Sequence, residues 1–462
     1  MNWVLNWIMA EGARARGWCP GAWKERALPR NRFGWPPALF AVALLIVFAM
    51  PAGGATDFIS GADFSLLTYF ESQGIQYQTN GQVEDALTIM KDSGLNCVRL
   101  RLFTSSAAQA SADPYNYINN LDYAVPLAVR VKNAGLRFLL DFHYSDTWAD
   151  PGHQAKPAAW ASLDFPSLVQ QMHDYSSNCI VAFRTAGAMP DYVQVGNEIT
   201  GGLLWPDGQV GTANDSVQWP KLAQLLNAAI QGIQDGSAGN PPKIMIHIDR
   251  GGDWNRTKWF FDNIRTQGVS YDLIGESYYP YWHGPWTNLN TCLRNAASRY
   301  GKPVVVAETD FPWAYSTNIY GIPATPDGQV SFAVVLAQIV KGIPSDMGGG
   351  IIWWGSEYQI PDANQAGFGT RSFFDSSGNV LPVAGAFGDM LAPLVLSPAL
   401  SGSSLTLTWP LSGAGMTLTS SGYLGAAANW VAVSNAIQNV GTRFTTTVPV
   451  DSQAKFYRLK SN

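Results

Sequence analysis

The stretch VQVGNEITGG, residues 193–202, places two valines at alternate positions directly before Gly196, Asn197 and Glu198. The valines are typical of a β-strand, whereas glutamate is depleted from strands and is seldom fully buried without a partner. A strand that ends on a glutamate therefore needs a fold in which strand ends meet at a polar site. The pattern of the remaining chain indicates such a fold.

Short apolar runs alternate with longer helical patterns from residue 58 to about residue 393. The eight predicted strands are residues 58–63, 96–103, 137–143, 192–198, 243–248, 272–278, 303–309 and 349–354. The predicted helices include residues 83–94, 123–135, 165–187, 219–236, 289–301 and 328–342. The strands lack strict apolar–polar alternation, which indicates burial on both faces and hence a parallel sheet. Such units predict an α/β fold, a (β/α)8 TIM barrel over residues 56–394, rather than a doubly wound sheet.

The amino-acid composition of the chain changes after residue 394. The segment becomes rich in Ser, Thr and Gly, and Leu405, Leu407 and Trp409 alternate with polar residues. This pattern predicts a small β-sandwich-like module over residues 395–462. The module either binds carbohydrate, the cell wall or a sorting partner, or is a spacer without a ligand. Trp409 and Trp430 fit a sugar-binding face or an ordinary core equally well.

The first 55 residues predict a signal peptide with a long leader. A basic region precedes the apolar residues 38–50, which are too few for a transmembrane helix of about 20 residues. Gly53 and Ala55 supply small residues for cleavage after Ala55. We therefore expect secretion to the extracellular space or periplasm, with no membrane attachment after cleavage. An uncleaved anchor is the alternative, and Met9 or a later residue is an alternative start.

Composition narrows the classes of function. Charged residues are 14% of the chain and the net charge is −5, which gives no basic footprint for nucleic acid. The 18 Trp, 18 Tyr and 21 Phe provide flat faces that suit sugar rings, or an ordinary aromatic core. Beyond the leader, the three cysteines Cys97, Cys179 and Cys292 allow at most one disulfide. We expect them to be small buried side chains rather than a disulfide framework. The histidines form no HxH or HExxH pair, so a metal-dependent hydrolase is disfavoured and no cofactor is expected.

Polar side chains follow the predicted strands where a barrel carries its active site. Glu198 ends the fourth strand and Glu308 ends the seventh. Two carboxyl groups with aromatic walls suit glycosidic cleavage, in which one protonates the leaving oxygen and the other attacks the anomeric carbon or activates water. A structural ion pair is the alternative for either glutamate. The other residues at these ends include Arg99, Arg101, Asp141, His143, Asp146, Asn197, His247, Asp249, Glu276, Tyr278, Tyr279, Trp353 and Trp354.

Several motifs resemble those of glycoside hydrolase family 53, the arabinogalactan endo-β-1,4-galactanases, within a large clan of retaining (β/α)8 glycosidases. They are GADFS, NCVRLRLF, LLDFHYSDTWADPGHQ, VQVGNEITGGLLWPDG, SYYPYWHG, VVVAETDFPW, PATPDGQ and GIIWWGSEY, in this order within residues 61–358. The combination of DFHYSDTWADPGHQ with SYYPYWHG is specific, whereas Asn-Glu alone is not. The resemblance covers residues 60–393 and leaves the C-terminal module unexplained.

The resemblance implies roles for the acidic pair and its neighbours. Glu198 corresponds to the general acid/base and Glu308 to the nucleophile of a retaining double displacement, with carboxyl groups about 5–5.5 Å apart. Asn197 corresponds to the residue that hydrogen-bonds the sugar 2-hydroxyl. Arg99 falls where an arginine keeps the nucleophile ionised, and Arg101 is the less favoured alternative.

The resemblance also implies the walls of the site. Tyr279 falls where a tyrosine bonds the nucleophile, and His143 where a histidine lines the site of the cleaved sugar. Trp354 corresponds to the platform beneath that sugar. Trp205 and Trp282 are expected to form walls for neighbouring sugars.

Two features depart from the family pattern. Glu276 stands where an apolar residue is usual, so it is either a third carboxylate facing the cleft or a paired structural charge, and we favour the second. Some family members bind calcium in a late loop. Residues 356–377 contain Asp362, Asn364 and Asp375 but no convincing calcium motif.

The resemblance implies a β-1,4-galactan polysaccharide as partner, namely the arabinogalactan type I side chains of pectin. We expect a monomer. Another retaining endo-glycosidase of the same clan, such as a mannanase or glucanase, is the first alternative. A carbohydrate-binding protein without catalysis is the second, and the presence of both glutamates argues against it.

Overall fold

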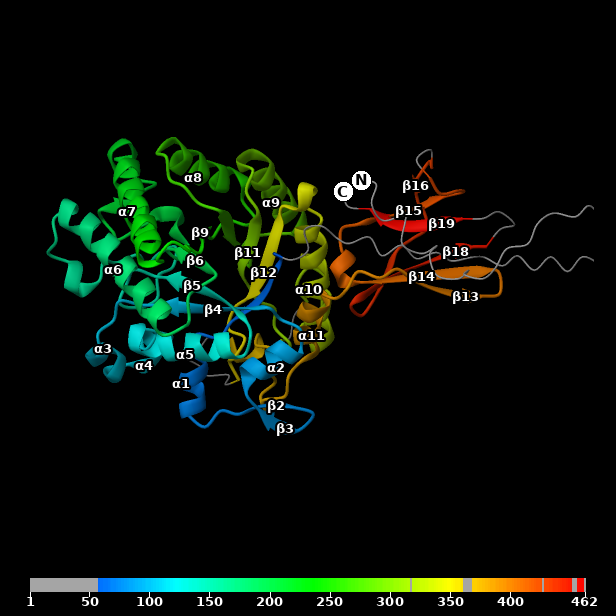
Figure 1. Cartoon of the computed structure of the whole chain (residues 1–462), viewed down its shortest axis with the longest axis horizontal. Helices are drawn as coiled ribbons and strands as arrows, with labels where there is room; N and C mark the ends of the chain where they lie inside the picture. Colours follow the sequence, from blue (N-terminus) through cyan, green and yellow to red (C-terminus); the bar gives the residue numbers. More distant parts are fainter. Residues whose placement is uncertain (1–56, 316–317, 360–367, 426–427, 451–454, 461–462) are drawn as a thin grey trace, which may run out of the picture. The chain divides into compact units, whose positions relative to one another are not determined.

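In a computed structural model of the chain, residues 57–315, 318–359, 368–425, 428–450 and 455–460 are described. Within this part, eight parallel strands close into a barrel (Figure 1), in the order β1, β12, β11, β10, β9, β6, β5 and β4. Their bounds are β1 Ile59–Asp63, β4 Cys97–Leu102, β5 Arg137–Phe142, β6 Tyr192–Val195, β9 Lys243–Ile248, β10 Leu273–Ser277, β11 Val304–Thr309 and β12 Gly348–Trp353. The predicted TIM barrel is confirmed.

A helix follows each barrel strand and covers its outer face. These helices are α2 Ala86–Asp92, α5 Leu121–Asn133, α6 Phe165–Thr185, α7 Asp215–Gly236, α8 Trp254–Thr266, α9 Trp286–Tyr300, α10 Pro326–Lys341 and α11 Pro382–Asp389. Several begin at a side-chain cap that accepts an otherwise unpaired backbone N–H, as Asp164 does from Ser167 before α6. Such caps fix where each helix begins after its loop.

Further short elements lie in the loops between barrel strands and helices. They are α1 Leu67–Ser72, β2 Tyr77–Thr79, β3 Gln82–Glu84, α3 Ala107–Ala112, α4 Pro114–Tyr117, β7 Gly202–Leu203 and β8 Gly208–Gln209. They all lengthen the loops that follow the carboxyl ends of barrel strands. In a TIM barrel these loops build the active site.

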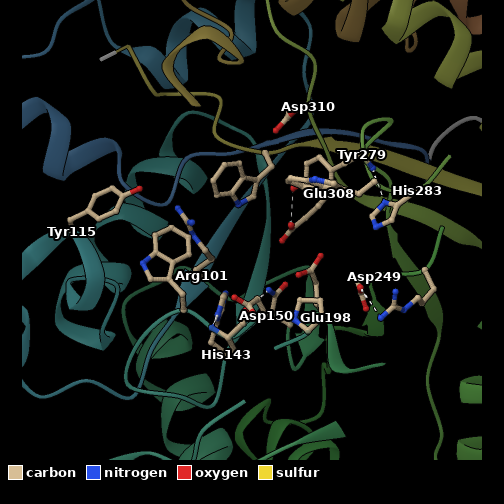
Figure 2. A pocket seen from close by; sticks show the side chains of 17 residues that line it. Arg101, Tyr115, His143, Asp150, Glu198, Asp249, Tyr279, His283, Glu308 and Asp310 are labelled. Atoms are coloured by element: carbon tan, nitrogen blue, oxygen red, sulfur yellow. Dashed lines mark hydrogen bonds and ion pairs between the residues drawn. The ribbon is translucent and has the colours of Figure 1, made fainter. Parts of the chain in front are cut away.

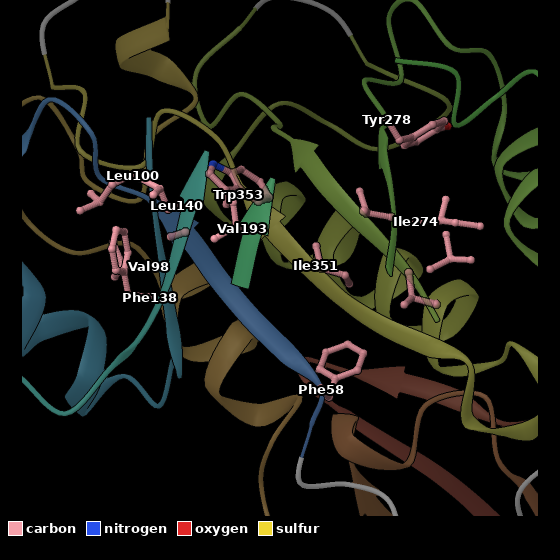
Figure 3. Close-up of a cluster of buried hydrophobic side chains, with 14 of the residues drawn as sticks. Phe58, Val98, Leu100, Phe138, Leu140, Val193, Ile274, Tyr278, Ile351 and Trp353 are labelled. Carbon is pink, nitrogen blue, oxygen red and sulfur yellow. The ribbon is translucent and has the colours of Figure 1, made fainter. Parts of the chain in front are cut away.

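Side chains of each barrel strand alternate between the barrel interior and the helix layer. On β4, Cys97 belongs to the small interior cluster, whereas Val98 and Leu100 belong to the large cluster under the helices (Figure 3). Arg99 and Arg101 share the side of Cys97, and both are almost completely buried. The same alternation places a layer of polar side chains inside the barrel, above its apolar base.

Alternation also decides the position of Glu276. Its neighbour Ile274 lies in the helix-facing cluster, and Glu276 on the same side of β10 contacts α8 instead of the cleft. Its carboxyl accepts hydrogen bonds from Thr257 Oγ1 at 2.9 Å and from the Arg250 backbone at 3.1 Å. Burial raises its pKa well above the ordinary value. Glu276 is therefore hydrogen-bonded under the helices and forms no ion pair among the described residues, which corrects the expectation of a paired charge.

The C-terminal segment forms two antiparallel sheets, which confirms the predicted all-β character. One sheet has the order β13 Ser397–Ser401, β14 Ser404–Pro410, β18 Arg443–Pro449 and β17 Gln438–Val440. The other has the order β16 Val431–Ala432, β15 Thr417–Ser421 and β19 Phe456–Lys460. Trp409 is 1% exposed and belongs to the core. Trp430 is half-buried, with the Arg458 guanidinium 4.1 Å from its ring centre.

The three cysteines beyond the leader are free and buried, as expected for small buried side chains. The predicted signal peptide lies outside the described residues. Among the helices of the described ranges, none is both long and apolar enough to cross a membrane.

Candidate active site

A cavity of about 560 Å³ lies at the carboxyl ends of the barrel strands (Figure 2). It brings together most of the residues predicted to form the site. They are His143, Asn197, Glu198, Tyr279, Trp282, Glu308 and Trp354. Arg99 lies beneath the cavity and reaches it through its contact with Glu308. Trp205 is not among the residues that line the cavity.

Glu198 reaches the cavity because β6 ends earlier than predicted. The strand stops at Val195, and Gly196 then adopts φ of 92°. Glu198 itself has φ of 50° and ψ of 46°, a left-handed conformation that is strained for a residue with a side chain. The turn is fastened to β9 by Thr200, whose hydroxyl bonds the Asp249 carboxylate at 2.5 Å. This local strain directs the Glu198 side chain into the cavity instead of along a strand face.

Glu308 lies opposite Glu198, and Figure 2 shows the two side chains pointing toward one another across the cavity. Its carboxylate is 2.7 Å from the Arg99 guanidinium. The Tyr279 hydroxyl donates to the other carboxylate oxygen at 3.0 Å. These two contacts match the roles expected of Arg99 and Tyr279, so Arg101 is not the partner of Glu308.

Arg99 is the centre of a buried polar network inside the barrel. It bonds Asp63 at 2.8 Å, Asp141 at 2.7 Å and Asn197 Oδ1 at 2.9 Å, and Gln194 Oε1 at 2.8 Å. A guanidinium presents several donors in a rigid plane, so one side chain can fix this many acceptors at once. The network holds Glu308 and the Asn197 side chain in one geometry.

Burial and charge separate the proton affinities of the two glutamates. Burial raises the pKa of Glu198 well above its usual value, and the nearby charges of Glu308 and Asp249 raise it further. Burial also raises the pKa of Glu308, but the Arg99 guanidinium opposes that increase. The guanidinium therefore favours the ionised form of Glu308 more strongly than that of Glu198, whose Oε1 accepts the Ser277 hydroxyl at 2.6 Å. The neighbouring groups therefore act differently on the pKa values of the two carboxyl groups.

His143 and Asn197 are both held by Ala149. The Ala149 backbone N–H donates to His143 Nδ1 at 2.9 Å, and its carbonyl accepts from Asn197 Nδ2 at 2.8 Å. Because His143 Nδ1 accepts the Ala149 N–H, the ring proton is on Nε2, which lies 2.9 Å from Asp141 Oδ2. Burial lowers the pKa of His143, and the nearby Asp141 carboxylate opposes that decrease.

Aromatic rings enclose the cavity. Trp354 and Trp148 meet edge to face with centroids 6.3 Å apart, and Trp282, which is 66% exposed, lies edge-on to Tyr279 at 5.2 Å. Trp205 instead folds back onto the preceding turn, where its indole N–H donates to the Gly201 carbonyl at 2.9 Å. Trp205 therefore does not line this cavity, and its role as a wall for neighbouring sugars stays a prediction.

Some site residues escaped the sequence analysis. Asp63 and Gln194 face the barrel interior and bond Arg99, and Ser277 bonds Glu198. Tyr115 of α4 and Trp148 of a loop line the cavity. The alternation of side chains along each strand points to the first three residues once one interior residue of that strand is known. Of the two aromatic residues, Trp148 lies within the motif DFHYSDTWADPGHQ, whereas Tyr115 belongs to none of the quoted motifs.

Within the described ranges, no group of three or more His, Cys, Asp or Glu residues is arranged to hold a metal ion. Asp362 and Asn364 of the late loop lie outside the described residues. Asp375 accepts hydrogen bonds from the backbones of Ser377 and Asn379 and closes a turn.

Comparison with models of known protein families shows to which family the chain belongs. The model described as glycosyl hydrolase family 53 matches residues 59–387, the segment that carries the barrel and every residue of the cavity. The chain belongs to glycosyl hydrolase family 53. This family 53 chain is a glycoside hydrolase, and the match ends before the C-terminal sheets begin.

Relatives of this family 53 chain include two fungal proteins. One, from Aspergillus fumigatus, is named probable arabinogalactan endo-β-1,4-galactanase A and is 37% identical over 67% of this chain and 87% of its own length. The other, an arabinogalactan endo-β-1,4-galactanase from Thermothelomyces thermophilus, is 36% identical over 71% of this chain and 98% of its own length.

Two solved structures of similar proteins also match the barrel domain of this chain. A fungal β-1,4-galactanase structure matches with a TM-score of 0.63 at 35% identity, over 71% of this chain and 98% of the other. The family 53 catalytic domain of Ignisphaera aggregans matches with a TM-score of 0.65 at 33% identity, over 74% of this chain and 98% of the other.

Proposed function

We propose that this chain is a secreted endo-β-1,4-galactanase that hydrolyses the β-1,4-galactan side chains of pectin with retention of configuration. The observation that carries the proposal is the opposed pair of a buried Glu198, whose pKa is raised, and a Glu308 held by Arg99 and Tyr279. The fungal relatives named as galactanases supply the substrate class.

The geometry fits a double displacement. Glu308 attacks the anomeric carbon while Glu198 gives its proton to the leaving glycosidic oxygen, and a glycosyl ester forms on Glu308. Glu198, now ionised, takes a proton from water, and that water cleaves the ester. Asn197 would contact the sugar 2-hydroxyl beside the reacting carbon. The separation of about 5–5.5 Å between carboxyl groups that retention needs stays a prediction.

Two isosteric variants test the acidic pair. Glu308→Gln and Glu198→Gln should each lower kcat on galactan by about 10,000-fold or more, because nucleophile and acid act as a unit. The surface variant Glu84→Gln is the matched control and should retain activity, since Glu84 is exposed on β3. Near-normal activity of either active-site variant would contradict the assignment.

A substrate panel tests the specificity and the stereochemistry. The mature chain should release short galacto-oligosaccharides from β-1,4-galactan, and the anomeric proton signals of the first products should be those of the β-anomer. Cleavage of mannan or cellulose but not of galactan would instead favour another glycosidase of the clan. Tight galactan binding without new reducing ends would identify a binding protein.

Secretion is a separate part of the proposal and rests on the pattern of residues 1–55. Expression of the full chain in a secreting host should release a protein whose first residue is Thr56. Amino-terminal sequencing of the exported protein measures this, and a chain retained with its apolar segment would support the anchor instead.

A further inference from the structure

Arg101 is a cavity residue that the reaction described above does not use. Its side chain is 1% exposed, yet none of its three guanidinium nitrogens has a hydrogen-bond partner among the described residues. Its one ion-pair contact is with Asp63 Oδ1 at 3.4 Å, an oxygen that already accepts the Ser65 hydroxyl and backbone N–H. Buried donors without acceptors cost free energy, so such a group in a binding cavity points to a missing ligand.

The aromatic neighbours leave those donors available. The Arg101 guanidinium lies 4.2 Å from the ring centre of Trp148 and 5.7 Å from that of Trp354. A guanidinium stacked on a ring keeps its N–H groups in its own plane, where a third group can accept them. Figure 2 shows Arg101 on the side of the cavity that also carries Tyr115 and His143.

The surrounding charge indicates a neutral acceptor. Arg99 and Arg101 face the carboxylates of Asp63, Asp141 and Glu308, so anions already outnumber guanidinium groups. An added carboxylate, such as that of a uronic acid, would increase the negative excess. Hydroxyl, ring and glycosidic oxygens of a neutral sugar accept hydrogen bonds without adding charge.

We infer that Arg101 is a substrate-binding residue whose guanidinium donates to neutral oxygens of a sugar bound beside Trp148 and Trp354. The inference rests on the proposed function and deepens it. It gives the cavity a charged donor in addition to its aromatic walls, so that one sugar is both stacked and fixed in orientation.

Binding measured without turnover tests the inference. In a Glu308→Gln background, titration calorimetry with galactotetraose should show that Arg101→Met raises Kd by about tenfold or more, because Met keeps the length but has no donors. Arg101→Lys should fall between the two, since it keeps one donor group but not the stacked plane. In the active chain, Arg101→Met should raise KM more than it lowers kcat.

Arg137→Met is the matched control. Arg137 also lies against an aromatic ring, 5.5 Å from the centre of Tyr192. It is the first residue of β5, at the end of the strand away from the cavity. Its Kd should stay within about twofold of the parent. Equal Kd values for the Arg101→Met and Arg137→Met chains would overturn the inference.

Two further readouts do not depend on the folding of an Arg101 variant. A crystal structure of the Glu308→Gln chain with galactotetraose should place an Arg101 nitrogen within about 3.2 Å of a sugar oxygen, and absence of this contact overturns the inference. Tetragalacturonate should bind more weakly than galactotetraose, and tighter binding overturns the neutral acceptor. If wild type cleaves no galactan and the Glu308→Gln chain binds no galactotetraose, the proposed function fails and this inference with it.

Discussion

Two glutamates in one cavity acquire different chemistry from their immediate neighbours. Glu308 contacts a guanidinium and a phenol hydroxyl, whereas Glu198 contacts the Ser277 hydroxyl and faces other acids. Both are buried, so the difference in proton affinity arises from charge and hydrogen bonding instead of exposure. The proposed roles of the two glutamates therefore depend on Arg99, Tyr279 and Ser277 as well as on the glutamates themselves.

The charge of Asp249 offers a test of this view by pH dependence. Asp249 raises the pKa of Glu198, and Glu198 must be protonated to act as the acid. Asp249→Asn removes the charge, lowers the pKa of Glu198 and should move the alkaline limb of the kcat/KM profile to lower pH. The exposed β3 variant Glu84→Gln is the control, and its alkaline limb should stay in place. An unmoved limb in Asp249→Asn would contradict the electrostatic account.

The sequence pattern predicts where the barrel strands lie, but it does not predict which side chains of a strand face the barrel interior and which face the helices. All eight barrel strands were predicted, because apolar runs bounded by turn residues are a strong local signal. The fourth ended early, since the left-handed Glu198 depends on contacts with β9 that no local pattern contains. Both faces of a parallel strand are buried, so composition alone does not tell which side chains line the interior. For this reason Asp63 and Gln194 were missed and the side of Glu276 was left open.

The position of Glu276 under α8 has a consequence for stability. Its folded pKa is raised well above the unfolded value of about 4.3, so its contribution is fully present below that pH and is lost as pH rises toward the folded pKa. Glu276→Gln removes this loss and should make the variant more stable than wild type, by up to about 1.4 kcal/mol more for each pH unit above 5. Urea unfolding at pH 5, 6 and 7 measures the difference, with the exposed Glu84→Gln as control. A gap that does not grow with pH would contradict the assignment.

At the scale of the whole molecule, the site is assembled from residues far apart in sequence. Arg99, Glu198 and Glu308 come from β4, the end of β6 and β11, and closure of the barrel brings them together. Sequence reasoning reached the pair because barrel strands present their carboxyl ends to one face, and the family motifs indicated its chemistry. It did not reach Arg101 as a binding residue, because that inference needs the rings that enclose it and the acceptors it lacks.

The C-terminal module lies outside the catalytic cavity. Every residue that lines the cavity precedes residue 355, whereas the module packs against α10 and α11 on the outside of the barrel, as in the hydrogen bond from Thr442 Oγ1 to Asp389. A chain that ends at Pro393 should therefore cleave galactotetraose with a kcat/KM within about twofold of the full chain. Loss of that activity in a folded truncated chain would contradict the assignment of a separate module.

Insoluble substrate separates the two roles left open for the module. If the module binds carbohydrate or the cell wall, the full chain should sediment with pectin-rich plant cell wall and the truncated chain should remain in solution. A spacer predicts equal sedimentation of both chains. The β16 variant Val431→Asp is a finer probe, because Val431 is 56% exposed beside Trp430 and the change leaves the catalytic cavity untouched. Reduced sedimentation with unchanged cleavage of galactotetraose would place the binding face on this sheet, because the two measurements depend on separate parts of the chain.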